Sequence, residues 1–146
     1  MIYIPKTWTL QNGQVSIITG SSCGIGRQIA EQLCARGSKV IWAARDTTKA
    51  QKALNDLTWS PSENFGPRGY VLRVDLASLE SIRRFVDEFK KREKSLDLLI
   101  LNAAYHGPYR MTDDGFEQTI GVNHLAVSLS CRPIYTDFAA ECPRKI

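Results

Sequence analysis

A glycine-rich turn holds the residues of this sequence that point most directly to chemistry. It runs from Thr19 to Gly26 and lies between an apolar run and a helical pattern. Gly20 permits a tight turn from strand to helix, Gly24 lets a pyrophosphate approach the backbone, and Gly26 removes a side chain where helix and strand meet. The free N–H groups at the start of the helix would face those phosphates. A glycine turn can be merely structural, but in a strand–helix–strand frame we expect this one to bind a dinucleotide.

The end of the second apolar run indicates which dinucleotide is bound. That run ends in Ala43-Ala44-Arg45 and not in the carboxylate that would hydrogen-bond the ribose 2′-hydroxyl of NAD. Arg45 could hold the 2′-phosphate of NADP with a charge-assisted, forked hydrogen bond. The alternative is a solvent-exposed arginine beside Asp46. We expect NADP (NADPH) to be the preferred cofactor, ahead of NAD.

Apolar runs alternate with helical patterns along the chain, which is typical of βαβ units on a parallel sheet. The runs predict strands over residues 15–19, 40–44, 70–74 and 98–101. We therefore expect an α/β fold, a doubly wound Rossmann-type parallel sheet. About four strands and four helices should be present.

The helical patterns give boundaries for each predicted helix. The first should be closed by Gly37 in the C′ position and carry an inward face of Ile25, Ile29, Ala30, Leu33 and Cys34. The second should span Asp46 to Leu57 with Asp46 or Thr47 as N-cap, and the third should follow from Ser78. A last helix is expected to be capped by Thr112 or Asp113 and to carry Phe116, Ile120 and Leu125.

Charge and cysteine content exclude several other classes of protein. Lys and Arg number 19 against 15 Asp and Glu, a net charge of +4, but the basic run Lys90–Arg92 is flanked by acids and is typical of a solvated helix face. We expect no nucleic-acid partner. The four cysteines and two histidines have no metal-ligand spacing, so no metal site is expected and the thiols should be reduced. No apolar run approaches the ~18 residues of a membrane span and no secretory signal is visible, so we expect a cytoplasmic protein.

The spacing TGxxxGIG resembles the short-chain dehydrogenase/reductase family, and other segments agree. The resemblance implies that Gly20, Ser22, Cys23, Gly24, Ile25 and Gly26 bind the cofactor. It implies the same for Asp75 and Leu76 after the third strand, and for Asn102-Ala103-Ala104, which is similar to the family's NNAG. Residues 112–125 look most like the retinol dehydrogenase and WW-domain oxidoreductase branches, and Asn123 there matches the asparagine of the catalytic tetrad. The resemblance implies that only the N-terminal half of the family's sheet is present, so we expect a dinucleotide-binding half-domain over 1–125 and a divergent tail over 126–146.

The family reaction transfers a hydride between the nicotinamide and an alcohol or carbonyl carbon. It uses a tyrosine followed four residues later by a lysine, and no Tyr-x-x-x-Lys is present in these 146 residues. The resemblance therefore implies an NADP-dependent oxidoreductase acting on a hydrophobic alcohol or carbonyl, and a chain that is catalytically incomplete as given. The alternative is a non-catalytic NADP-binding or partner-sequestering module.

The fourth apolar run, Leu98–Leu101, has a consequence for partners. Without a further strand it would form an exposed sheet edge, which invites aggregation or pairing with another chain. We expect a marginally stable monomer whose open edge could pair with a full-length homologue.

Overall fold

The computed structural model describes residues 13–57 and 69–130. The strands are β1 (Val15–Thr19), β2 (Lys39–Ala44), β3 (Gly69–Arg73) and β4 (Leu98–Ile100). The helices between them are α1 (Gly24–Ala35), α2 (Thr47–Asn55) and α3 (Leu79–Arg92). After β4 come the short helix α4 (Gln118–Ile120) and the π-helix η1 (Gly121–Leu125), and residues 126–130 continue as α-helix. All four predicted strands are confirmed to within a residue at each end.

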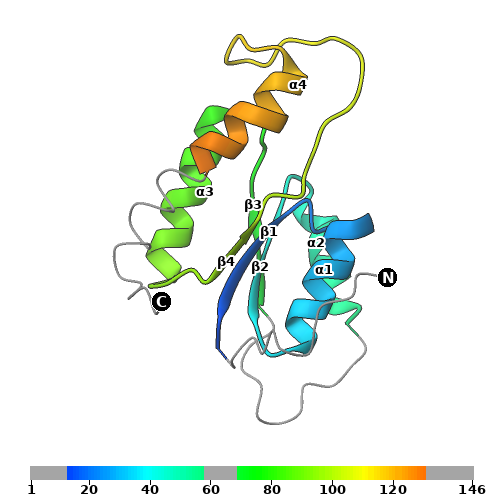
Figure 1. Ribbon diagram of the computed structural model, residues 1–146, viewed down its shortest axis with the longest axis vertical. Coiled ribbons are helices and arrows are strands. Elements are labelled where there is room, and N and C mark those ends of the chain that lie inside the picture. Colours follow the sequence, from blue (N-terminus) through cyan, green and yellow to red (C-terminus); the bar gives the residue numbers. More distant parts are fainter. Residues whose placement is uncertain (1–12, 58–68, 131–146) are drawn as a thin grey trace, which may run out of the picture.

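The four strands form one parallel sheet in the order β3-β2-β1-β4 (Figure 1). Ile17 at the centre pairs with Ile41 of β2 on one side and Leu99 of β4 on the other. Chain order thus proceeds from β1 outward to β3, and then returns to the other side of β1 at β4. The predicted α/β class is confirmed, and the strand order reverses between β1 and β4 as it does in Rossmann-type sheets.

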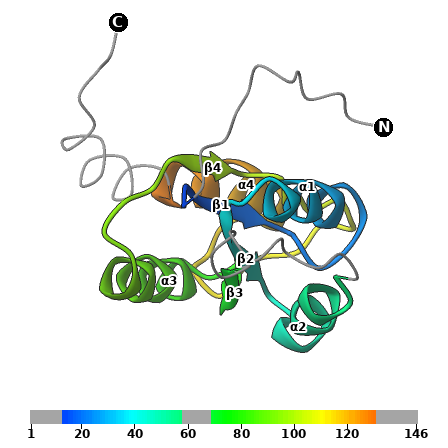
Figure 2. The ribbon, with the colours of Figure 1, turned by 90° about the horizontal axis from the view of Figure 1, so that it is seen from below.

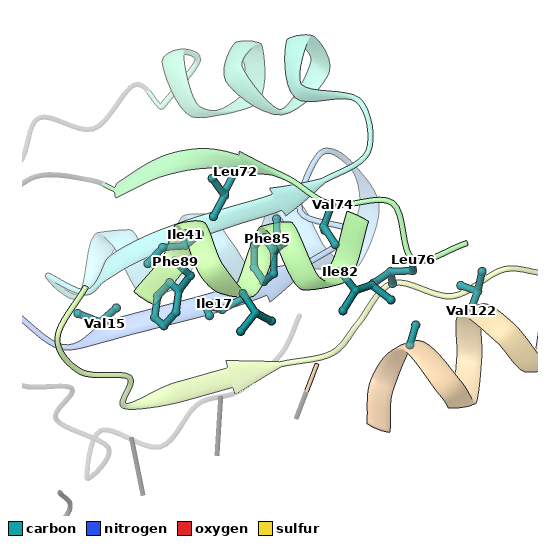
Figure 3. Packing of buried hydrophobic residues seen from close by; sticks show 13 residues of the cluster. Val15, Ile17, Ile41, Leu72, Val74, Leu76, Ile82, Phe85, Phe89 and Val122 are labelled. Atoms are coloured by element: carbon teal, nitrogen blue, oxygen red, sulfur yellow. The ribbon is translucent and has the colours of Figure 1, made fainter. Parts of the chain in front are cut away.

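Helices cover both faces of the sheet (Figure 2). On one face, α1 and α2 bury Leu33 and Leu54 against Ile18, Val40 and Trp42. On the other face, α3 contributes Ile82, Phe85, Val86 and Phe89, which pack against residues of β1, β2 and β3 (Figure 3). Val122 and Ala126 join this second cluster, so the last helix also lies on the α3 face. Two separate apolar layers fix the sheet and with it the ends of its strands.

Local signals in the sequence set the helix ends. The Asp46 carboxylate accepts a hydrogen bond from Lys49 N at 2.9 Å and caps α2, and Ser78 caps α3 through Ser81 N at 3.2 Å. Gly37 has a φ of 85° and follows α1 in a Schellman motif, in which Ser38 N donates to Leu33 O and Gly37 N donates to Cys34 O. These three predicted boundaries are confirmed.

The predicted start of the last helix is wrong. Thr112 and Asp113 lie in a tight loop, where Thr112 N donates to Phe116 O at 2.8 Å and Gly115 has a φ of 79°. The helix begins at Gln118, and Glu117 is its N-cap. Phe116, which was expected on this helix, lies before its start, and Phe116 and Ile120 are 39% and 57% exposed. The cause is the turn sequence Asp113-Asp114-Gly115, whose glycine takes a left-handed conformation that a helix cannot contain.

The described residues contain no helix long and apolar enough to cross a membrane. The expected division of the chain at residue 125 stays a prediction. The helix that contains Asn123 continues through residues 126–130, and the expected tail beyond them lies outside the described residues.

Candidate functional site

A cleft of about 800 Å³ lies at the carboxyl ends of the strands. Its lining comes from the residues that follow β1, β2, β3 and β4, together with the first turns of α1 and α2. This is the place where open α/β sheets bind ligands, because the loops diverge where the strand order reverses. Every cofactor-binding residue predicted from the sequence lines this one cleft: Gly20, Ser22, Cys23, Gly24, Ile25, Gly26, Arg45, Asp75, Leu76, Asn102, Ala103 and Ala104.

The glycines of the turn after β1 have three different surroundings. Gly20 has a φ of 69°, and a Cβ there would lie 3.0 Å from Ala103 Cα. Gly24 has a φ of 57°, and a Cβ there would meet nothing within 4 Å. At Gly26, a Cβ would lie 2.5 Å from Asn102 Nδ2 and still closer to the Gly20 carbonyl oxygen. Gly20 and Gly26 are therefore required by packing, whereas Gly24 faces the open space of the cleft.

The loop after β4 is tied to the end of β1. Asn102 Nδ2 donates to Thr19 O at 3.1 Å, and Ala103 N donates to Thr19 Oγ1 at 3.1 Å. Gly20 N in turn donates to Ala43 O of β2 at 2.9 Å. These bonds hold three strand ends in register, so the glycine turn and the Asn102–Ala104 segment form a fixed wall of the cleft.

The end of β2 leaves room and a positive charge in the cleft. Ala43 and Ala44 line it with small side chains, and Arg45 next to them is exposed. Arg45 forms no ion pair within residues 13–57 and 69–130, whereas Arg27, Arg84 and Arg92 are each paired with a glutamate four residues away. The neighbouring Asp46 carboxylate caps α2. An anionic group in this part of the cleft would therefore meet an unpaired guanidinium.

Asp75 lies on the wall that follows β3. Its Oδ1 accepts from Ala77 N at 3.0 Å, and its own N–H donates to Ser81 Oγ at 2.9 Å. Both bonds tie the residue to the start of α3, so its backbone and carboxylate have fixed positions beside Leu76.

Asn123 does not line the cleft but is bonded to a residue that does. Its Oδ1 accepts from Tyr105 N at 2.8 Å, and its Nδ2 donates to Tyr105 O at 2.9 Å. The asparagine lies within η1, where Ala126 N donates to Gly121 O, five residues back. π-Bulges of this kind are frequent at functional sites. The carboxamide therefore acts on the cleft by holding the loop after β4, and its predicted catalytic role stays a prediction.

The structure adds lining residues that the sequence did not indicate. Lys49 of α2 and Gln118 and Val122 of the last helix line the cleft, as does Tyr105. Ile25 was also expected to face the core, which is wrong, because it is 63% exposed at the first turn of α1. At that turn the helix faces the cleft and not the sheet, and helical periodicity carries no signal for this difference.

The described residues contain no group of His, Cys, Asp and Glu that could hold a metal ion. His106 and His124 are both exposed. Cys23 is exposed in the glycine turn, and Cys34 is buried in α1.

The parallel sheet, the glycine turn and the cleft at the reversal of strand order together define a Rossmann-type dinucleotide-binding unit. Residues 14–142 match the model of the family described as short chain dehydrogenase. The chain belongs to this family of oxidoreductases, whose members bind NAD or NADP.

Its relatives include retinol dehydrogenase 13 of Mus musculus, which is 40% identical over 135 residues. That alignment covers 92% of this chain and 40% of the relative. Protochlorophyllide reductase of Daucus carota is 41% identical over 134 residues, covering 88% of this chain and 32% of the relative. The chain thus spans well under half the length of these curated relatives. Among solved structures, L-sorbose reductase from Gluconobacter frateurii, complexed with NADPH and L-sorbose, has a TM-score of 0.69 and 27% identity over 88% of this chain and 49% of its own.

Proposed function

We propose that the cleft binds NADP(H), and that this chain is the cofactor-binding half of an oxidoreductase that acts on a hydrophobic alcohol or carbonyl. One observation carries the cofactor preference: an unpaired Arg45 lines the cleft at the end of β2, and two alanines stand there in place of a carboxylate. The substrate class is supported by the similarity to retinol dehydrogenases.

The residues present fit a dinucleotide. The cleft volume of about 800 Å³ lies within the range of cofactor sites. A cradle is open at Gly24, where even a methyl group would fill space that a pyrophosphate needs. Gly20 to Gly26 would hold the pyrophosphate, Asp75 and Leu76 the adenine, Arg45 the 2′-phosphate, and Asn102 to Ala104 the nicotinamide half. The bound nicotinamide would supply or accept the hydride.

The loop after β4, which would face the reacting end of the cofactor, is held in place by hydrogen bonds from two other elements. The Asn123 carboxamide fixes both backbone groups of Tyr105, and the Asn102 and Ala103 bonds to Thr19 fix the other side of the same loop. We infer that these bonds preorganise the loop, so that binding does not require it to be ordered anew.

We also propose that residues 1–146 alone bind the cofactor without turning over substrate. No tyrosine in the chain is followed four residues later by lysine, so the family's proton donor has no counterpart. Turnover would need such a pair from further chain or from a partner.

A second candidate function is supported by the exposure of β4. Leu98, Leu99 and Ile100 are all partly exposed, whereas every residue of β1 is buried. Within the described residues β4 pairs with β1 alone. An apolar edge of this kind could pair with a strand of a full-length homologue, which would make the chain a non-catalytic, partner-sequestering module.

The test is a fluorescence titration of the purified chain with NADPH, followed by a turnover assay with retinal. We expect saturable binding and no NADPH oxidation. Absence of binding would refute the cofactor proposal, and oxidation of NADPH would refute catalytic incompleteness. Sedimentation velocity of the chain mixed with a full-length relative tests the second candidate, for which a joint species is required.

A further inference from the structure

β3 is an outer strand of the sheet, and within the described residues it pairs with β2 alone. Val74 N, directly after the strand, donates to Ala44 O of β2 at 3.1 Å. Because the direction of backbone groups alternates along a strand, the N–H and C=O of Leu72 also face β2, whereas those of Val71 and Arg73 point away from it. The outer side of β3 therefore offers two donors and two acceptors to another strand.

A separate cleft borders this edge on each face of the sheet. On one face, a cleft of about 440 Å³ lies between Leu72 and one side of α3, and we name it the α3-side cleft. On the other face, a cleft of about 690 Å³ lies between Val71 and one side of α2, and we name it the α2-side cleft. Figure 2 shows β3 between these two helices. A strand added to β3 would thus have a helix beside each of its faces, as strands of a parallel sheet require.

The two clefts differ in the charges that they leave unpaired. In the α3-side cleft, the charges of Arg84 and Glu88 are already paired within α3. Two exposed cations, Arg73 and Lys91, and one exposed acid, Asp87, form no ion pair within the described ranges. The α2-side cleft holds one lysine and one aspartate, and its other helical lining is threonine, glutamine and asparagine. Carboxylates are therefore favoured in the α3-side cleft, and uncharged polar side chains suit the α2-side cleft.

A lone peptide fits this edge better than a second copy of the chain. α2 packs on the edge strand itself, because Val71 lies against the apolar cluster to which Leu54 of α2 belongs. Two sheets joined at β3 would have their joined strands about 5 Å apart. Helices that lie over those strands would then be closer than the about 8–10 Å at which helices pack. A single extended peptide brings no helix and meets no such clash.

We propose that the outer side of β3 is a docking site for an extended acidic peptide of a partner protein, which adds a strand to the sheet. The peptide backbone bonds to Val71 and Arg73, and alternate side chains enter the two clefts. Its carboxylates meet Arg73 and Lys91 in the α3-side cleft. This edge is the one opposite to β4, and the proposal does not depend on what the cofactor cleft binds.

The experiment measures fluorescence anisotropy of a fluorescein-labelled peptide of three Glu-Thr repeats, titrated with the purified chain. A peptide of three Lys-Thr repeats is the control for charge. Val71→Pro removes one outward N–H, a position at which an edge strand tolerates proline, and Val71→Thr is its matched control because it keeps that N–H. We expect saturable binding of the Glu-Thr peptide to wild type and Val71→Thr within about twofold of each other. Val71→Pro, and the Lys-Thr peptide with wild type, should bind at least about 10-fold more weakly.

A second measurement leaves the protein unchanged, so it decides the matter even where Val71→Pro does not fold. The Glu-Thr peptide is N-methylated either at its glutamates or at its threonines, because the N–H groups of alternate residues face β3 and solvent. One methylated peptide should bind at least about 10-fold more weakly than the unmodified peptide, and the other within about twofold of it.

Several results would overturn the inference. Wild type that binds neither peptide, or binds both equally well, would do so, as would a folded Val71→Pro that binds like wild type. Equal effects of the two methylation patterns would mean that no strand is added to the sheet. Self-association in sedimentation velocity that Val71→Pro abolishes would assign the edge to a second copy instead. Each of these results leaves the NADPH titration, and with it the proposed function, untouched.

Discussion

Gly24 and Gly26 lie two residues apart in one turn, and adding a methyl group to one should mainly weaken cofactor binding, whereas adding it to the other should mainly lower stability. In Gly26→Ala the new Cβ would lie 2.5 Å from Asn102 Nδ2 and closer to the Gly20 carbonyl oxygen, which is backbone and cannot move freely. Overpacking of this kind costs about 1–3 kcal/mol. Displacing Asn102 would also break its hydrogen bond to Thr19 O, which costs about 1 kcal/mol. Alanine has a higher helix propensity than glycine by about 1 kcal/mol, so these two contributions to stability cancel.

In Gly24→Ala the Cβ would meet nothing within 4 Å, so the cost is only that of a φ of 57°, about 1–2 kcal/mol. The methyl group would, however, occupy the space in which we place the pyrophosphate. We therefore expect Gly24→Ala to fold and to weaken NADPH binding at least about 10-fold, through lost backbone contacts to the phosphates. Gly26→Ala should be the less stable variant.

The assays are urea unfolding followed by circular dichroism, and NADPH titration under native conditions. Gly26→Ala should lower the free energy of unfolding by about 2–3 kcal/mol at the upper end of the overpacking range. The expectation for Gly24→Ala is a smaller loss of stability and the larger loss of affinity per folded molecule. Equal stability of the two variants, or wild-type affinity in Gly24→Ala, would refute the assignment of the two glycines.

Three further predictions concern charge and the last helix. Arg45→Asp should lower NADPH affinity at least about 10-fold and favour NADH, and an unchanged NADPH/NADH affinity ratio would contradict the assignment. Asn123→Ala removes two bonds to Tyr105 and should cost about 1–3 kcal/mol in urea unfolding, with faster amide exchange confined to the loop after β4. Bonds from Thr119 N and Ile120 N lower the pKa of Glu117 below its ordinary value of 4.5. Its contribution to stability is therefore present above pH 4.5 and is lost as the pH falls through the lower folded-state pKa. The free energy of unfolding of Glu117→Gln, measured in urea, should therefore fall less steeply with pH in that range than that of the wild type.

The sheet could be predicted from the sequence because its signals are local. The runs 15–19 and 40–44 are short, mostly apolar and rich in β-branched residues, and runs of this length between helical patterns favour buried strands. Asp46, Ser78 and Gly37 cap helices through bonds made within a few residues, so their identity alone marks the boundary. The glycine turn was recognisable for the same reason.

Features that depend on contacts distant in the chain could not be predicted. Asp114 lies in the loop before the last helix, and its Oδ2 accepts from Leu79 N, at the start of α3 and 35 residues away in the chain. The clamp between Asn123 and Tyr105 joins residues on two elements, and no pattern in the sequence marks it. Lys49 lies on the polar side of an amphipathic helix, where a residue that lines a cleft and one that faces solvent look alike.

The central claim is that NADP(H) binds at the carboxyl ends of these strands. An NMR titration of the isotopically labelled chain with NADPH tests it most directly. We predict saturable shifts of the backbone amides of Gly20, Gly24, Arg45, Asp75 and Ala103, all of which line the one cleft. Shifts confined to residues outside it, such as Gln51 and Val71 of the separate cleft between α2 and β3, would contradict the claim, as would a spectrum that NADPH leaves unchanged.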